Sequence, residues 1–362
     1  MGCGSSVAGV ARPPSAEERG AAAAAALRGS FGSRPSGSSA NRKREPHCAP
    51  VAPQGDLNLP VGRSVGVSYG SCTIPGFDPP RPNRPNQDAF VCLERFGNST
   101  QSAFAVLDGH GALGQEVAGF CRKRLPANLA KSMQREGTVT EAMAAAFADT
   151  QTALRKGRVD CTISGSAVSM ALLRGEELFV ANAGDCRVVL GRERGSHYEA
   201  IDLSVDHKPD RPDERERLLK SGARVEPVRL QSSNNFVGPM RVWKKMSNVP
   251  GLAVSRSMGD LIGHTIGVLT QPEFTHTHLD EHDHYLILAS DGVWEWLSSQ
   301  DAVDIVSRCA EEGSDASVAC EQLARAAYAR WEEEGNGVAD DTTAVVVYFV
   351  HDDDSELAAI EA

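Results

Sequence analysis

Aspartates recur in this sequence where apolar runs begin or end, next to turn-forming residues. Asp108 directly follows the apolar run 102–107 and precedes Gly109, His110 and Gly111. An apolar run of this length is typical of a buried strand, and the glycines indicate that the backbone turns where the strand ends. The carboxylate and the imidazole would then have a rigid support, on which a metal ion or a reacting group can be held. Taken alone, the stretch is explained equally well by an ordinary turn in which Asp108 caps the next helix.

Asp88 is tied to Asp108 by the expected pairing of two strands. Asp88 precedes a predicted strand at 89–93, and only a short connection separates this strand from 102–107. A short connection favours an antiparallel hairpin, in which the start of the first strand lies beside the end of the second. We therefore expect Asp88 and Asp108 to face each other at one edge of a sheet.

Three further acids occupy similar positions. Asp291 follows a predicted strand at 284–289, Asp340 precedes the last predicted strand at 342–350, and Asp185 lies in a turn between two strands. If the last two strands pair antiparallel, Asp291 and Asp340 also share an edge. Carboxylates that gather without partners repel one another, which raises their pKa values, and a cation removes that cost. Oxygen ligands suit Mg²⁺ or Mn²⁺, and two such ions can activate a water and neutralise a phosphate. Separate strand-end turns or surface ion pairs are the alternative.

The elements that must position these acids follow from hydrophobic periodicity. We predict strands at 65–70, 89–93, 102–107, 165–173, 177–182, 186–191, 197–202, 273–278, 284–289 and 342–350. We predict helices at 112–133, 138–156, 211–221, 299–312 and 315–333, and an irregular stretch at 223–250. Because the long helices come in pairs between groups of strands, the pattern favours an α+β fold of antiparallel sheets with helix pairs outside.

Composition and charge narrow the class of protein. Of 362 residues, 41% are hydrophobic and 23% charged, as in a soluble globular protein. The first 60 residues carry a net charge of +3 and the remainder −14, and an acidic body argues against nucleic acid as a partner. The nine cysteines form no CxxC pair, and no secretory signal precedes them. We therefore expect free thiols in the cytoplasm and no structural zinc.

The N-terminal segment differs from the rest of the chain. Residues 1–60 are rich in Gly, Ala, Ser, Pro and Arg, which predicts disorder before a folded domain at 61–350 and an acidic tail at 351–362. Gly2 stands in a myristoylation pattern, and Cys3 beside it can accept a second acyl chain. Two chains would anchor the protein peripherally to the cytoplasmic face of a membrane. A glycine-rich start by chance is the alternative.

Several ordered motifs resemble those of the metal-dependent protein phosphatases of type 2C, over roughly residues 61–350. The segments that carry the resemblance are Pro85–Asp88, Asp108–Gly111, Ser164–Ala167, Ala181–Arg187, Leu203–Pro209, Leu252–Asp260, Ala289–Glu295 and Asp340–Thr343. Each motif alone is weak, but all of them in this order are specific. The resemblance implies a central antiparallel β-sandwich flanked by pairs of helices, and a binuclear Mg²⁺ or Mn²⁺ centre.

The resemblance also implies roles for individual residues. Asp108 would bridge the two ions, with the carbonyl of Gly109 on one of them. Asp291 and Asp340 would ligate the other ion. The remaining assignments are Asp88 at the site directly or through a water, Asp185 at a third, weaker ion, and His110 as the general acid.

Three departures from the family pattern bear on these assignments. Gln87 stands where Glu is frequent, which predicts a modestly weaker metal site. The usual phosphate-binding arginine is replaced by Asn83, and we assign that role to the neighbouring Arg84, for which a solvated surface arginine is the alternative. Glu295 replaces a commoner Asp and is long enough to reach a third ion.

The stretch 223–250 falls where the family has a flap beside the site. Trp243, Lys244 and Lys245 are candidates to contact the substrate, although Trp243 can equally anchor the flap while the lysines are solvated. The predicted function is hydrolysis of phosphoserine and phosphothreonine in phosphoproteins by a monomer. The alternatives are a pseudophosphatase acting as a binding module and a phosphatase of small molecules.

Overall fold

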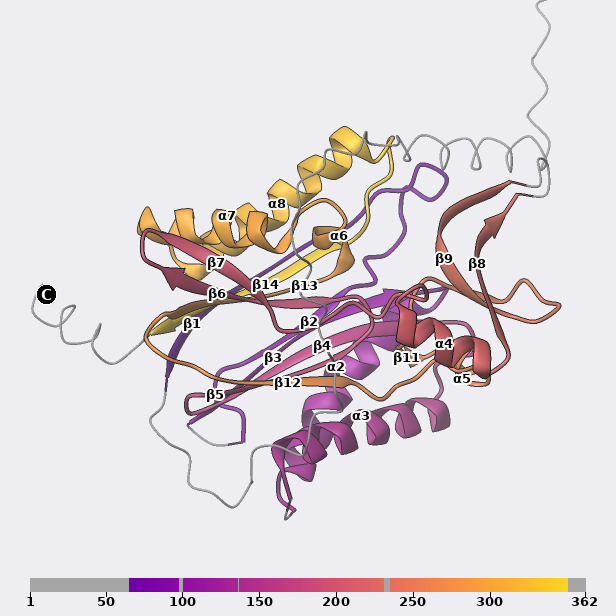
Figure 1. Cartoon of the computed structure of the whole chain (residues 1–362), viewed down its shortest axis with the longest axis horizontal. Coiled ribbons are helices and arrows are strands. Elements are labelled where there is room, and N and C mark those ends of the chain that lie inside the picture. Colours follow the sequence, from indigo (N-terminus) through magenta and orange to yellow (C-terminus); the bar gives the residue numbers. More distant parts are fainter. Residues whose placement is uncertain (1–64, 98–99, 136, 231–234, 351–362) are drawn as a thin grey trace, which may run out of the picture.

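Four layers, a helix pair on each side of two packed antiparallel sheets, make up the structure (Figure 1). The computed structural model describes residues 65–97, 100–135, 137–230 and 235–350. The layers confirm the predicted α+β class with a central β-sandwich. The predicted segments 1–60 and 351–362, with Gly2 and Cys3, lie outside the described residues.

The first sheet has the strand order β12-β5-β4-β3-β2, and the short strand β11 pairs with β4. Its strands are β2 (Ala89–Leu93), β3 (Gln101–His110), β4 (Gly165–Arg174), β5 (Glu177–Ala183), β11 (Met258–Gly259) and β12 (Glu273–His278). Helices α2 (Gly114–Ser132) and α3 (Val139–Lys156) cover its outer face with buried side chains such as Leu125 and Phe147. Helix α3 begins where predicted because Thr138 and Glu141 form a capping box.

The second sheet has the order β1-β14-β13-β6-β7. Its strands are β1 (Gly66–Ile74), β6 (Arg187–Arg194), β7 (His197–Asp202), β13 (Asp283–Ala289) and β14 (Thr342–Val350). Helices α6 (Asp291–Trp294), α7 (Ser299–Glu311) and α8 (Ala316–Glu334) lie on its outer face. Side chains such as Phe104, Leu190 and Val345 fill the space between the two sheets. Covered on both faces, the central strands read as continuous apolar runs.

The stretch 223–250 was predicted to be irregular, and this prediction is wrong. It contributes to a third sheet of order β10-β9-β8, called the flap below, with strands β8 (Ala223–Arg229), β9 (Phe236–Lys244) and β10 (Pro250–Leu252). Its Pro and Gly residues read as turn signals, but Pro227 sits where the β8–β9 register shifts, a bulge that tolerates proline. Helices α4 (Pro212–Lys220) and α5 (Leu261–His264) lie near the flap in Figure 1.

The strand before the first acidic motif is longer than predicted. Strand β3 pairs with β4 as far as His110, opposite Gly165, so Asp108 and His110 lie within the strand rather than after it. Residues two apart in a strand point to the same face, which turns both side chains to one side of the sheet. Among the described residues, no helix has both the length and the apolar character needed to cross a membrane.

Candidate metal centre and active site

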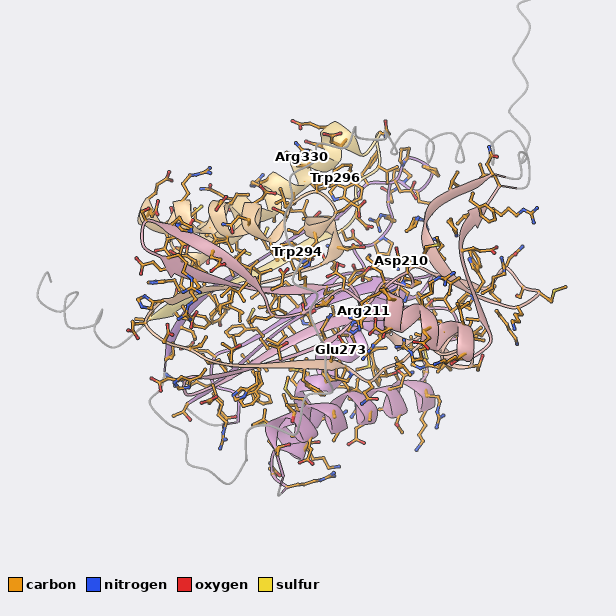
Figure 2. All side chains as sticks on the ribbon, in the orientation of Figure 1. Asp210, Arg211, Glu273, Trp294, Trp296 and Arg330 are labelled. Carbon is orange, nitrogen blue, oxygen red and sulfur yellow. The ribbon has the colours of Figure 1, made fainter. Side chains whose placement is uncertain are left out.

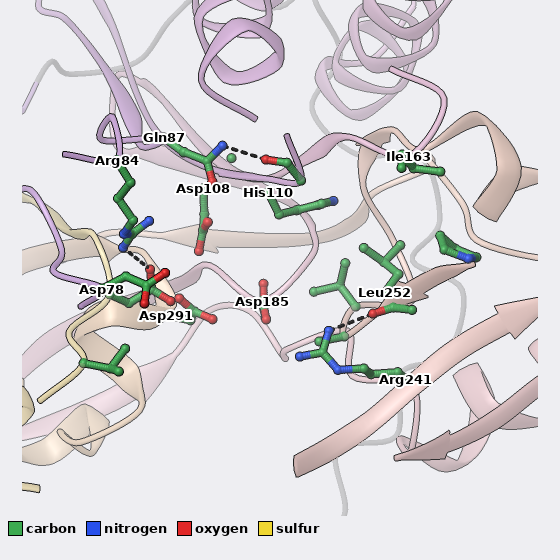
Figure 3. A pocket seen from close by; sticks show the side chains of 18 of the residues that line it. Asp78, Arg84, Gln87, Asp108, His110, Ile163, Asp185, Arg241, Leu252 and Asp291 are labelled. Carbon is green, nitrogen blue, oxygen red and sulfur yellow. Dashed lines mark hydrogen bonds and ion pairs between the residues drawn. The ribbon is translucent and has the colours of Figure 1, made fainter. Parts of the chain in front are cut away.

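The predicted convergence of the acids is confirmed by the strand pairing. In the β2–β3 pair Ala89 lies opposite Leu107, which brings the flanking Asp88 and Asp108 to one edge. In the β13–β14 pair Ala289 lies opposite Ala344, which brings Asp291 near Asp340 in the same way. Residues from both edges, together with Asp185 from the β5–β6 turn, line one cleft of about 540 Å³ (Figure 3).

Three of these carboxylates form a compact group. One oxygen each of Asp108, Asp185 and Asp291 lies within 4.8 Å of the other two. Asp340 lines the same cleft, and the charges of both Asp88 and Asp340 act on Asp108. We refer to these five residues as the cleft acids.

Glycines allow the backbone to come close to the cleft acids. A Cβ atom on Gly109 would lie 2.4 Å from the carbonyl oxygen of Gln87, and one on Gly292 would meet the Asp341 carbonyl oxygen. Only glycine therefore fits at position 109 with this backbone, which carries the Gly109 carbonyl group beside Asp108. Gln87 itself donates a hydrogen bond from Nε2 to the Gly111 carbonyl oxygen, at 2.8 Å.

Three of the cleft acids, Asp88, Asp108 and Asp291, have the raised pKa values of carboxylates whose charge is not compensated. Burial, followed by the charges of Asp291 and Asp88, raises the pKa of Asp108 well above its usual value. Burial also raises the pKa of Asp88 well above its usual value, although Ser290 donates a hydrogen bond of 2.8 Å to its Oδ2. Burial and the charge of Asp185 raise the pKa of Asp291 to about 7. Because the donors are all oxygens and their charge is largely unmatched, the group fits a hard divalent cation such as Mg²⁺ or Mn²⁺.

Two cations border the cleft acids. The Lys208 ammonium group donates to Asp185, and its pKa is raised because nearby acids, Asp185 first, outweigh the opposing effect of burial. Arg84 donates from Nη2 to Asp340 at 3.0 Å and from Nη1 to Asp341 at 3.1 Å. Burial would lower the pKa of Arg84, but the charges of these two acids raise it.

The imidazole of His110 lies beside the cleft acids and has a partner of its own. Its Nε2 is 2.6 Å from Oδ2 of Asp260, a side chain with no exposed surface. The same oxygen accepts a hydrogen bond of 2.6 Å from the Ser257 hydroxyl. Burial opposes protonation of the ring, but the charge of Asp260 outweighs it, so the pKa of His110 is raised. Gly165 makes this contact possible, because a Cβ there would lie 2.0 Å from that Asp260 oxygen.

Sequence reasoning assigned no role to Asp260 or Lys208, and it placed Asp341 only beside Asp340 before the last strand, at the edge expected to be shared with Asp291; all three contact the predicted site residues. Asp341 accepts hydrogen bonds from the backbone N–H groups of Gly76 and Gln87 as well as from Arg84, so it fixes the loop before β2. All three residues lie in motifs that carry the family resemblance, so the sequence marked their positions. A motif does not show, however, which side chain each of them will contact.

Other predicted residues lie apart from the cleft acids. Trp243 donates from its indole nitrogen to the Glu226 carbonyl oxygen at 2.8 Å, within the flap. This bond agrees with the anchoring alternative for Trp243, while Lys244 and Lys245 are exposed. Glu295, at the end of α6, is exposed as well.

A second group of acids has the same spacing but a different environment. One oxygen each of Asp213, Glu214 and Glu273 lies within 4.8 Å of the others. Arg217 and Arg256 bind Glu214, while Arg211 binds both Asp213 and Glu273. Figure 2 labels Arg211 and Glu273 beside α4, where Nη2 and Oε1 are 2.5 Å apart.

These arginines reverse the direction of the pKa shifts in the second group. Burial alone would raise the pKa of Glu214, but hydrogen bonds from Arg217 and Arg256 lower it to about 2. Arginines already neutralise the negative charge of this second group, so we expect it to bind a divalent cation only weakly.

Comparisons with known proteins agree with the geometry of the site. A family model described as protein phosphatase 2C matches residues 81–334. The chain is 32% identical over 309 residues to "Probable protein phosphatase 2C 35" of Arabidopsis thaliana, covering 82% of this chain and 87% of that protein. It is 38% identical over 274 residues to "Probable protein phosphatase 2C 64" of Oryza sativa subsp. japonica, covering 73% of this chain and 62% of that protein.

Solved structures with the same fold include one titled "Crystal structure of serine-threonine phosphatase 2C from Toxoplasma gondii". The two chains superpose with a TM-score of 0.68 at 22% sequence identity, covering 83% of this chain and all of that one. At this identity the likeness supports the fold.

Proposed function

Because the chain belongs to the protein phosphatase 2C family and is a metal-dependent phosphoprotein phosphatase, we propose that it hydrolyses phosphoserine and phosphothreonine at a binuclear Mg²⁺ or Mn²⁺ centre. The observation that carries this proposal is the group formed by Asp108, Asp185 and Asp291, with oxygens within 4.8 Å of one another. Burial and mutual repulsion raise the pKa values of Asp108 and Asp291. A metal centre explains why a fold would retain so costly an arrangement.

The proposed ligand roles are those that the family resemblance implies. Asp108 would serve both ions, the Gly109 carbonyl oxygen one of them, and Asp291 and Asp340 the other, with Asp88 at the site directly or through a water. Asp185, which is held by Lys208, would serve a third and weaker ion. When bound, the ions would lower the pKa of a water that attacks phosphorus and would neutralise the charge of the phosphate.

His110 is proposed to donate a proton to the departing serine or threonine oxygen. An alkoxide is a poor leaving group, so a protonated imidazole close to it lowers the barrier. Asp260 favours the protonated ring through its charge and the 2.6 Å contact, and acts as a positioning residue.

Arg84 is proposed to orient the phosphate at the wall of the cleft. A guanidinium carries five N–H donors. The contacts of Arg84 with Asp340, Asp341 and the Ala339 carbonyl oxygen use three of them. The N–H of Nε and one N–H of Nη1 remain, and each can donate one hydrogen bond to a phosphate oxygen.

Association with membranes is proposed from the N-terminal sequence alone. Myristoylation of Gly2 with a second acyl chain on Cys3 would hold a folded domain at 61–350 on the cytoplasmic face of a membrane, as a monomer. A Gly2→Ala protein should then move to the soluble fraction of fractionated cells. If the variant stays with the membranes, the anchor is elsewhere.

The catalytic proposal is tested by hydrolysis of p-nitrophenyl phosphate and of phosphoserine peptides with and without Mn²⁺. We expect Mn²⁺-dependent release of phosphate from both, with the peptides as the better substrates. Folded protein that releases no phosphate at any Mn²⁺ concentration would favour the binding-module alternative. Hydrolysis confined to small phosphate esters would favour the small-molecule alternative.

A further inference from the structure

The catalytic cleft reaches beyond the cleft acids to the flap. Figure 3 shows Asp108 and Asp291 toward one end, and Leu252 and Arg241 toward the other. Arg241 lies on β9, and its side chain extends toward the residues after Pro250. A peptide bound with its phosphate at the acids would therefore have room to pass Arg241.

Arg241 differs from the other two arginines that line the cleft. Arg81 is bonded to Asp78 at 2.9 Å, and Arg84 is bonded to two acids. Arg241 donates from Nη1 to the Gly251 carbonyl oxygen at 2.7 Å, while its buried Nε has no hydrogen-bond partner. No ion pair joins Arg241 to a carboxylate within the part of the chain that the structure describes.

The nearest candidate partner on the flap is already engaged. Glu226 lies opposite Arg241 in the β8–β9 register, but its carboxylate is ion-paired with Arg224. Arg224 is held in turn by the Ser247 carbonyl oxygen at 3.0 Å and lies over the Trp243 ring. The positive charge of Arg241 is therefore left for a group that the described residues do not supply.

Apolar residues surround this end of the cleft. Leu252 and Val254 are 7% and 4% exposed, and Ile163 contributes an exposed apolar side chain to the lining. Burial lowers the pKa of Arg241, although a guanidinium remains charged at neutral pH. A partly buried charge without a counter-ion is costly, and in such surroundings it attracts an anion strongly.

We propose that Arg241 is a specificity-determining residue that binds an anionic side chain of the substrate, a carboxylate or a second phosphate, a few residues from the phosphoresidue. The proposal rests on the proposed function, because hydrolysis at the cleft acids is what places the peptide. An extended peptide advances about 3.3 Å per residue, so the responding position lies within a few residues on one side.

The test uses the full-length protein, Mn²⁺ and phosphoserine peptides in which a single Glu is moved through the three positions before and after the phosphoserine. Each peptide is compared with its Gln counterpart, and a second phosphoserine at the best position separates phosphate from carboxylate. At one position we expect kcat/KM to favour Glu over Gln by about 10-fold, as for a hydrogen bond to a charged group. The preference should shrink in high salt.

Variants assign the preference to one side chain. Arg241→Met should bring the Glu/Gln ratio close to one, and Arg241→Lys should restore part of it. Arg229→Met is the matched control, because Arg229 is an exposed arginine of the same sheet outside the cleft lining. It should keep the ratio of the unmodified protein.

The failures of the two proposals are distinguishable. If the unmodified protein hydrolyses the peptides with a ratio of one at every position, the assignment of Arg241 is wrong and the phosphatase proposal stands. If the Arg241→Met protein still favours Glu over Gln as the unmodified protein does, the assignment of Arg241 is likewise wrong and the phosphatase proposal stands. If no peptide is hydrolysed by folded protein, both proposals fail.

Discussion

Two groups of three carboxylates in this molecule have the same spacing and opposite electrostatics. In the first, Asp108, Asp185 and Asp291 have oxygens within 4.8 Å of one another, and so do Asp213, Glu214 and Glu273 in the second. Burial and repulsion raise the pKa values of Asp108 and Asp291. In the second group, hydrogen bonds from arginines lower the pKa values of Asp213 and Glu214, and bonds from His207 and Arg211 lower that of Glu273, despite burial.

The difference teaches that proximity of acids does not by itself make a metal site. Where the protein supplies the opposite charge, as Arg217 and Arg256 do for Glu214, the cluster is an internal ion-pair network that joins α4 to neighbouring segments. Where the protein leaves most of the negative charge without a positive partner, binding of a cation from solution is electrostatically favourable.

The largest effect is expected from Asp108→Asn in the first group. Activity should fall below detection, because the ions that Asp108 would hold supply several kcal/mol of barrier lowering. The protein should still fold, and without metal it should unfold at the same or a higher temperature, because one of the mutually repelling charges is gone. Turnover and thermal unfolding in EDTA check both parts. Unchanged turnover would remove the bridging role.

Glu214→Gln should have the opposite profile in the second group. The Glu214 side chain has no exposed surface, and losing its charge leaves Arg217 and Arg256 without their central partner. We expect a loss of about 3 kcal/mol in unfolding free energy, the scale measured when a buried ion pair is broken. Mn²⁺ affinity, measured on the folded protein by calorimetry, should change little.

The same residue predicts an acid dependence of stability. The pKa of Glu214 is about 2 in the folded protein against an ordinary value of 4.5, so the unfolded chain binds the proton first as the pH falls. The stabilisation from this group is complete above about pH 4.5 and is lost as the pH approaches 2. In denaturant titrations at several pH values, Glu214→Gln should flatten this part of the curve. A parallel curve would contradict the assignment.

Asp260→Asn should lower turnover by about 10- to 100-fold, less than the roughly 10²- to 10⁴-fold that general acid catalysis contributes, because His110 itself is retained. Without the charge of Asp260, the pKa of His110 should fall, so the loss of activity with rising pH should begin at a lower pH. The pH profile of kcat checks this, and a profile of unchanged shape would give Asp260 a purely structural role.

The last prediction concerns the metal-free protein between about pH 4 and 7. The pKa of Asp291 is raised to about 7 in the fold, so in EDTA the protein should lose stability as the pH rises through this range. This loss should appear as a fall in Tm as the pH rises, and saturating Mn²⁺ should abolish it. Equal pH dependence with and without Mn²⁺ would mean that the ions bind elsewhere.

Features that depend on local sequence pattern and on pairing of adjacent strands could be predicted from the sequence. The hairpin 89–107 places Asp88 and Asp108 together because its short connection leaves one register in which the apolar faces match. The strands around Asp291 and Asp340 are separated by helices in the sequence, so their pairing was stated only as a condition, and the structure shows them antiparallel. Pairing across a short connection can be predicted from alternation and spacing, whereas pairing across intervening helices cannot.

What escaped sequence reasoning depends on contacts between distant segments. Asp260 reaches His110 across 150 positions of sequence, through a loop with no periodicity. The flap was missed because its strands contain Gly238-Pro239 and Pro250-Gly251, residue pairs that elsewhere signal turns. That Arg241 has no ion-pair partner among the described residues can be seen only once the positions of the surrounding acids are known.

The central claim is that the cleft acids hold a pair of divalent cations while the arginine-bound acids hold none. Anomalous diffraction from a crystal soaked in Mn²⁺ tests both halves in one map. We expect two peaks about 3.5–4 Å apart, the spacing of two-metal sites, beside Asp108. We expect no peak at Glu214. A map with no peak in the cleft, or with its strongest peak among Asp213, Glu214 and Glu273, would contradict the account.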